Sequence, residues 1–205
     1  MANKKADTGW STIIAISAFI LIVAIWVFIP PGVIRSAWIA ERAEVYAVAG
    51  KGESAVYGRT FDDLQKSLAG DFRGYIRDAE AIGQGPLGNV GFSRWTQDRI
   101  MATWLWIGLI AYRLQVLTGW LLPGIPLMLA AYLDGHFVRE IRKYSFVAQS
   151  PIRHKLGVRV MWMVLAGLAG WIVVPVPMPS LLAPMLIVSI SYSLWLWVSN
   201  LQKRL

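Results

Sequence analysis

The two histidines of this sequence, the residue type most often used in acid–base and metal chemistry, both fall between Asp134 and Arg159. His136 and Glu140 follow Asp134 closely, and His154 is the other histidine. Carboxylates and imidazoles can bind zinc, but the helical spacings H-x-x-x-H and H-E-x-x-H are absent. No G-x-S-x-G nucleophile elbow occurs, and there is no cysteine for thiolate chemistry. The sequence therefore predicts no catalytic residue, no metal site and no cofactor, and we interpret both histidines as interfacial polar residues.

Cations are the most distinctive feature of the same stretch. Cations just beyond an apolar segment orient it and attract anionic lipids, and they can also dock a partner protein. We predict that the cations of this stretch contact a partner or lipid. They are Arg139, Arg142, Lys143, Arg153, Lys155 and Arg159.

Arg113 interrupts the apolar run Ile100–Leu133. An arginine there is costly unless it reaches the interface, forms a pair or faces a polar cavity. No acidic residue falls inside the apolar segments to pair with it, which argues against a proton relay or an ion-coupled transporter. We expect Arg113 and Asp134, which ends the run, to be intramembrane or interfacial polar residues. Interfacial anchoring of Arg113 is the simpler interpretation, and a buried role stays open.

Apolar segments must position these residues, and the predicted fold class is all-α. The chain is 56% hydrophobic and only 16% charged, with 11 tryptophans, a residue that favours the membrane–water interface. Ser11–Ile29 holds 19 residues without a charge, enough to cross about 30 Å of hydrocarbon. Pro30, Pro31 and Gly32 end it, and we interpret it as an uncleaved anchor rather than a signal peptide.

Three further apolar segments complete the prediction of a polytopic inner-membrane protein with about four transmembrane helices. Ile100–Leu133 is longer than one span needs and contains Pro123 and Pro126, which permit a kink. Arg159–Val176 and Leu181–Leu201 form a predicted helical hairpin. The small residues of Gly167–Gly170 are expected to let another helix approach closely.

The segment Val33–Arg99 differs in kind, because it has balanced acidic and basic residues and helical periodicity. We predict a small helical periplasmic insertion between the first two spans, with a helix beginning at Thr60. The glycine-rich stretch Gly83–Gly91 lacks the Lys-Ser/Thr of a phosphate-binding loop, and we interpret it as a flexible turn.

Charge near the span ends sets the expected orientation. Four spans place the N-terminus, the loop 134–159 and the C-terminus on one side, and these hold the excess of Lys and Arg. The positive-inside bias makes that side cytoplasmic. It also accounts for the net charge of +8, so we predict no direct binding to nucleic acid.

The resulting division of the chain has five parts. They are residues 1–32, the N-terminus and first span; 33–99, the periplasmic segment; 100–133, the second span; 134–159, a basic cytoplasmic loop that starts with a turn at Asp134–Gly135; and 160–205, the helical hairpin with a cytoplasmic C-terminus.

The C-terminal half, over about residues 99–205, resembles a membrane-protein family of integrating conjugative elements and conjugative plasmids. In that family an arginine begins an apolar, proline-containing run that ends in Asp-Gly and a basic string. The matching residues here are Arg113, Pro123, Asp134, Gly135, Arg139, Ile141, Arg142, Lys143 and Tyr144. A His-Lys pair (His154, Lys155), a proline turn (Pro175–Pro179) and a basic end (Lys203–Leu205) continue the similarity.

The resemblance implies a place in DNA conjugation, because such proteins are encoded beside the type IV coupling ATPase. We expect a non-enzymatic accessory or scaffold subunit of a conjugative type IV secretion system. This subunit would associate with the coupling ATPase or with other membrane subunits. Self-association into a homo-oligomer stays open. One alternative is a small membrane enzyme or transporter that acts on lipid or a solute. Another is an entry-exclusion or regulatory membrane protein that uses the periplasmic segment for recognition.

Overall fold

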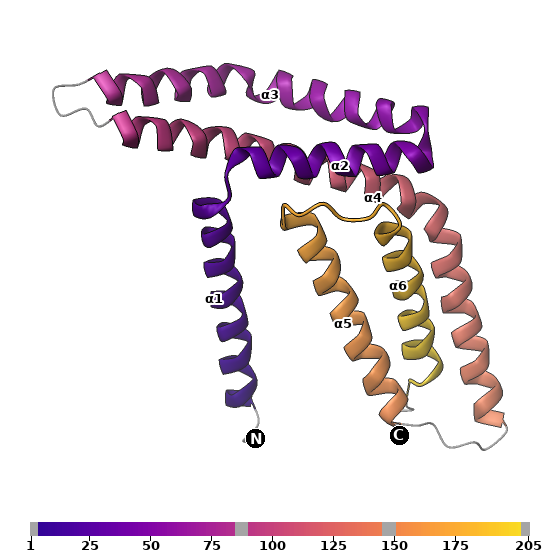
Figure 1. The fold of residues 1–205 in the computed structure, drawn as a ribbon. Coiled ribbons are helices and arrows are strands. Elements are labelled where there is room, and N and C mark those ends of the chain that lie inside the picture. Colours follow the sequence, from indigo (N-terminus) through magenta and orange to yellow (C-terminus); the bar gives the residue numbers. More distant parts are fainter. Residues whose placement is uncertain (1–3, 85–89, 145–150, 202–205) are drawn as a thin grey trace. The chain divides into compact units, whose positions relative to one another are not determined.

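A computed structural model describes residues 4–84, 90–144 and 151–201, and these residues form α-helices and no strand (Figure 1). This confirms the predicted all-α class. The helices are α1 (Lys4–Phe28), α2 (Pro31–Ala49), α3 (Lys51–Gln84), α4 (Val90–Tyr144), α5 (Pro151–Val173) and α6 (Leu182–Ser199). Most of the stretch Gly83–Gly91, predicted to be a turn, lies outside the described residues.

The breaks between the first helices follow from proline and glycine. Helix α1 ends at Phe28, just before Pro30, and Pro31 opens α2, where its missing N–H has no helical partner to lose. The chain bends by 102° between the two helices. Gly50 adopts φ +55° after α2, a left-handed conformation that suits glycine at a helix end. Helix α3 runs from Lys51 straight through Thr60, so the predicted helix start at Thr60 is wrong.

Helix α4 is continuous over 55 residues. At about 1.5 Å per residue it is roughly 80 Å long, far more than the hydrocarbon thickness of about 30 Å. It continues through Pro123 and Pro126 and through Asp134–Gly135, where we expected a turn. That expectation is wrong, and the basic stretch 134–159 is largely helical, divided between the end of α4 and the start of α5.

The chain divides into two compact units, each built from segments far apart in the sequence. The first unit is Met1–Ala40, Arg59–Leu109 and Pro175–Pro177. The second unit is Glu41–Gly58, Ile110–Val174 and Met178–Leu205.

In the first unit, Arg99 of α4 closes the end of α1. Its Nη1 donates to the carbonyl oxygens of Trp26 (2.6 Å), Val27 (3.0 Å) and Ile29 (3.0 Å). These carbonyls lie at the end of a helix, where no further backbone N–H can reach them, and the negative end of the helix dipole favours a cation. The Trp26 indole also donates to the hydroxyl of Thr103 at 2.8 Å. Arg99 therefore fastens α1 to α4.

In the second unit, α5 and α6 lie side by side as the predicted hairpin, and α4 packs on α6 (Figure 1). Glycines mark the closest approaches. A Cβ built on Gly124 would lie 2.6 Å from Ile187 Cγ2, and one on Gly157 would lie 3.0 Å from the backbone N of Trp197. By contrast, nothing lies within 4 Å of a Cβ built on Gly167 or Gly170, so the close approach expected there is wrong.

Three described helices are long and apolar enough to cross a membrane: the one from Gly91 to Tyr144, Ile152–Val173 and Leu182–Ser199. The count rises to four if the bent pair Ala15–Phe28 and Pro31–Ala49 is taken as one broken span. These helices are consistent with the predicted place in a membrane.

Candidate functional site

The most strongly buried charge in the second unit is Arg113, whose residue is 0% exposed. Its Nη1 donates to three carbonyl oxygens at the end of α5: Trp171, Ile172 at 3.3 Å and Val174 at 2.7 Å. The guanidinium also lies 6.0 Å from the ring of Trp171. Arg113 of α4 thus caps α5 in the way that Arg99 caps α1.

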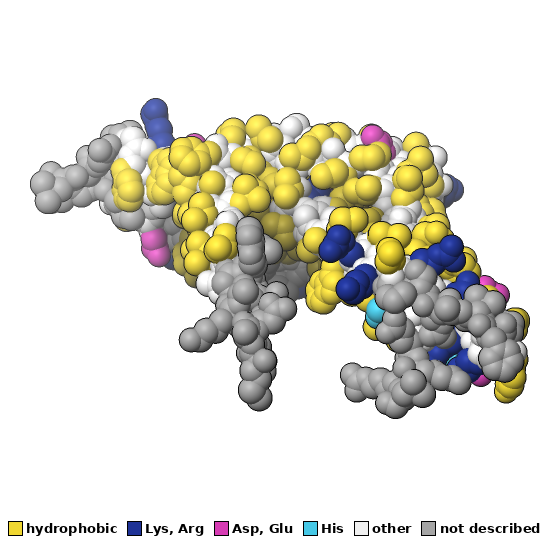
Figure 2. Space-filling view, turned by 90° about the horizontal axis from the view of Figure 1, so that it is seen from below, with side chains coloured by type: hydrophobic (Ala, Val, Ile, Leu, Met, Phe, Trp, Pro, Cys, Tyr) yellow, Lys and Arg dark blue, Asp and Glu magenta, His cyan; other side chains and the backbone are white. Residues whose placement is uncertain are grey.

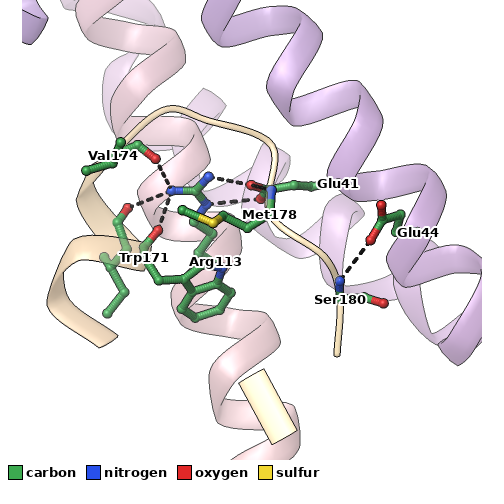
Figure 3. Close-up of polar contacts among 8 residues, drawn as sticks. Glu41, Glu44, Arg113, Trp171, Val174, Met178 and Ser180 are labelled. Carbon is green, nitrogen blue, oxygen red and sulfur yellow. Dashed lines mark hydrogen bonds and ion pairs between the residues drawn. The ribbon is translucent and has the colours of Figure 1, made fainter. Parts of the chain in front are cut away.

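Glu41, in the middle of α2, supplies the opposite charge (Figure 3). One of its oxygens accepts from Arg113 Nε at 3.0 Å, and the other accepts from Arg113 Nη2. Two parallel bonds between a guanidinium and a carboxylate give a strong and well-oriented pair. Glu41 is only 4% exposed, so each charge depends on the other for its partner.

The acidic side chains of α2 also hold the connection between α5 and α6. Glu41 Oε1 accepts from the backbone N of Met178 at 3.2 Å, and Glu44 Oε2 accepts from that of Ser180 at 2.9 Å (Figure 3). Proline-rich connections such as this one have few backbone donors of their own. We call Glu41, Arg113 and the carbonyls of Trp171, Ile172 and Val174 the arginine–glutamate cluster.

The space at this cluster is small. The cavity lined by Glu41, Arg113 and Trp171 holds about 10 Å³, enough for one water molecule at most. The cluster can therefore fix helix ends in place, but its donors and acceptors are occupied by the protein itself.

A second polar group lies beside it, where α2 meets α3. Arg42 Nε donates to Glu53 Oε1 at 2.7 Å, and the Tyr112 hydroxyl donates to the same oxygen at 3.4 Å. The Arg42 guanidinium stacks 3.4 Å from the centre of the Tyr57 ring. Glu53 is 2% exposed, so this group also joins helices internally.

Asp134 and Gly135, the predicted membrane exit, form a junction between α4 and α6. Asp134 is exposed, and its Oδ2 accepts from the Trp195 indole at 2.6 Å. A Cβ built on Gly135 would lie 3.2 Å from the Trp195 carbonyl oxygen. About two turns further on, Arg142 Nη1 donates to the Ser199 carbonyl at 3.2 Å, at the end of α6. The family-like stretch is therefore a contact between helices.

The remaining predicted cations lie at the end of the second unit where α4 ends and α5 begins. Figure 2 shows Lys and Arg side chains gathered there against a largely hydrophobic surface. Arg153, Lys155 and Arg159 are exposed, whereas Arg139 is half-buried and its Nε has no hydrogen-bond partner among the described residues. Lys143 pairs with Glu140 on its own helix. We call this region the basic end; its described cations are Arg139, Arg142, Lys143, Arg153, Lys155 and Arg159.

The structure does not join the two histidines into a metal site. Within the described ranges, no group of three or more His, Cys, Asp or Glu side chains is placed to hold a metal ion. His136 is exposed and lies against the ring of Phe137, while His154 is half-buried.

Sequence reasoning missed Glu41 and Trp195. Glu41 lies in the segment predicted to be extramembrane. The expectation that Arg113 has no acidic partner considers only the residues inside the apolar runs. An unpaired arginine buried in an apolar segment is costly. That cost indicates that a carboxylate from another part of the chain pairs with Arg113. No comparable signal in the sequence singles out Trp195 among 11 tryptophans.

A comparison with known families identifies a matching family model. The family model described as DtrJ-like, IncC plasmid conjugative DNA transfer protein, matches residues 87–202, more than half of the chain. The matched residues include Arg113, Asp134 and the basic end, but not Glu41. No curated protein and no solved structure matches the chain.

Proposed function

Because the chain belongs to the DtrJ-like family of conjugative DNA transfer proteins, we propose that it is a non-enzymatic membrane subunit that holds other components of the transfer machinery together. Its partner in this proposal is the type IV coupling ATPase or another membrane subunit of the secretion system. The basic end faces the cytoplasm, as the positive-inside bias predicts.

The arginine–glutamate cluster is the observation that carries this proposal. Charges buried inside an apolar protein often mark substrate or ion pathways. Here the guanidinium of Arg113 is used by Glu41 and by the end of α5, and the cavity beside it has room for one water at most. Such an arrangement favours a framework with a fixed shape over a site that turns over a substrate.

The basic end is the docking surface in this proposal. Arg153 is exposed, and Arg139 forms no ion pair among the described residues, whereas Arg142 and Lys143 bond within the protein. An acidic patch on the partner protein would attract these cations, and this charge complementarity would guide the two proteins together and fix how they align. Arg139 and Arg153 are therefore the cations to change.

The test reverses both charges, Arg139→Glu with Arg153→Glu, in a donor strain. We expect DNA transfer to fall at least tenfold and the coupling ATPase to be lost from the protein purified in a gentle detergent. The matched control is Arg73→Glu with Arg77→Glu, two exposed cations of α3, which should change transfer little. His136→Ala should also be nearly silent, because this exposed histidine belongs to no described polar cluster.

Two results would contradict the proposal. One is normal transfer and normal co-purification in the variant with Arg139 and Arg153 reversed. The other is loss of transfer in the His136→Ala protein at an unchanged level and stability in the membrane, which would point to chemistry at the basic end.

A further inference from the structure

An open groove runs along the first turns of α5. It has a volume of about 580 Å³ and is lined by His154, Lys155, Val158, Arg159 and Trp162. At 100° per residue these positions fall within an arc of about 140°, so they share one face of the helix. The groove is thus a property of α5 and does not use the residues of the arginine–glutamate cluster.

The near end of the groove carries two positive charges. Lys155 and Arg159 stand four residues apart, where like charges on a helix repel. The sequence 151–173 has no Asp or Glu. Among the described residues, neither Lys155 nor Arg159 forms an ion pair.

His154 also lines the groove. Its Nδ1 is buried and has no hydrogen-bond partner in the part of the chain that the structure describes. That nitrogen is covered by the protein, so we leave it out of the binding site. The groove therefore offers two exposed cations to an occupant, Lys155 and Arg159.

The far end of the groove is apolar. Trp162 is 69% exposed and lies seven residues beyond Lys155, about 10 Å along the helix. Met163 next to it is 61% exposed, as expected of a helix surface in contact with lipid tails. An occupant that contacts both ends needs a negative head group at Lys155 and an apolar tail that reaches Trp162, one to two helix turns further along α5.

We propose that this groove binds one anionic phospholipid. Its phosphate lies between Lys155 and Arg159, where a guanidinium can donate two parallel bonds to phosphate oxygens, and its acyl chain follows Val158 and Trp162. The lipid compensates the charge of α5 at the level where the helix leaves the hydrocarbon. This site is separate from the docking role of Arg139 and Arg153.

The test titrates the purified full chain in detergent with phosphatidylglycerol and, separately, with phosphatidylcholine, and counts bound lipid by native mass spectrometry. The test variant is Lys155→Gln with Arg159→Gln. The control is Arg73→Gln with Arg77→Gln, which removes two exposed cations at the same spacing from α3. Inorganic phosphate serves as a competitor that has the charge but no tail.

We expect the wild type and the control to bind one phosphatidylglycerol more tightly than phosphatidylcholine. The test variant should bind phosphatidylglycerol about 30-fold more weakly, since each basic residue near an anionic lipid surface contributes about fivefold. Equal binding of the two lipids by the wild type would overturn the proposal, as would an equal loss in test and control variants. Displacement of the lipid by equimolar inorganic phosphate would also overturn it, because the groove would then be a simple anion site.

Discussion

Breaking the arginine–glutamate cluster from one side should destabilise the second unit strongly. Arg113→Met removes the guanidinium and leaves the carboxylate of Glu41, 4% exposed, without its counter-charge. It also leaves three carbonyls at the end of α5 without a donor. Methionine keeps most of the volume of the side chain, so the loss reports on polar contacts rather than on a cavity.

The expected magnitude comes from a comparison with Arg99, which serves three carbonyls but has no carboxylate partner among the described residues. Hydrogen bonds inside membrane proteins average about 0.6 kcal/mol each, so Arg99→Met should cost about 2 kcal/mol. Removing one partner of a buried ion pair costs about 3–5 kcal/mol, which we expect for Arg113→Met. The difference, about 1–3 kcal/mol, is the contribution of Glu41.

The assay is equilibrium unfolding of the purified protein in mixed micelles with increasing SDS, followed by tryptophan fluorescence. Glu41→Gln and the double variant with Arg113→Met complete a double-mutant cycle. Because the two side chains bond to each other, the double variant should lose less free energy of unfolding than the sum of the single variants, by at least about 1 kcal/mol.

Two outcomes would refute this reasoning. If Arg113→Met cost no more than Arg99→Met, the carboxylate of Glu41 would contribute nothing. If the losses in the cycle were additive, Arg113 and Glu41 would act independently and would not form one cluster.

Two further changes test the junction between α4 and α6 in the same unfolding assay. Gly135→Ala should cost about 1–3 kcal/mol, because its Cβ would lie 3.2 Å from a backbone oxygen of α6. Gly167→Ala, with open space around it, should be neutral or stabilise the helix by up to about 1 kcal/mol. Equal effects of the two substitutions would contradict the packing described. Trp195→Phe removes the indole donor to Asp134 and should cost about 0.5–1 kcal/mol. The loss is modest because the carboxylate is exposed to solvent. An unchanged free energy of unfolding would show that the bond contributes no stability.

The features that sequence reasoning predicted well are those set by local chemistry. The end of α1 follows from Pro30 and Pro31, and the proline-rich turn after Val174 separates α5 from α6. These signals act within a few residues, where fixed φ angles and missing donors decide the backbone. The all-α class followed from the long apolar segments.

The features that sequence reasoning missed depend on contacts between segments that are distant in the sequence. Asp134–Gly135 looks like a break in a helix, yet α4 continues because α6 packs against Gly135 and Trp195 donates to Asp134. Pro123 and Pro126 also lie inside α4, and neighbouring groups in a membrane protein can satisfy the carbonyls that such prolines free. The pairing of Glu41 with Arg113 joins residues 72 positions apart, and no local pattern encodes it.

The arginine that closes the end of α1 also sets an order in the biogenesis of the protein. Arg99 lies 70 residues after Ile29, whose carbonyl it satisfies. At about 5–20 residues per second, the ribosome adds Arg99 roughly 4–14 s after the end of α1 has been made. During that interval the last carbonyls of α1 must be hydrated or bound by the insertion machinery. The end of α5 has no such delay, because Arg113 precedes it and is already present when Val174 is added. Anchoring of α1 is thus a late event of synthesis, and capping of α5 can be immediate.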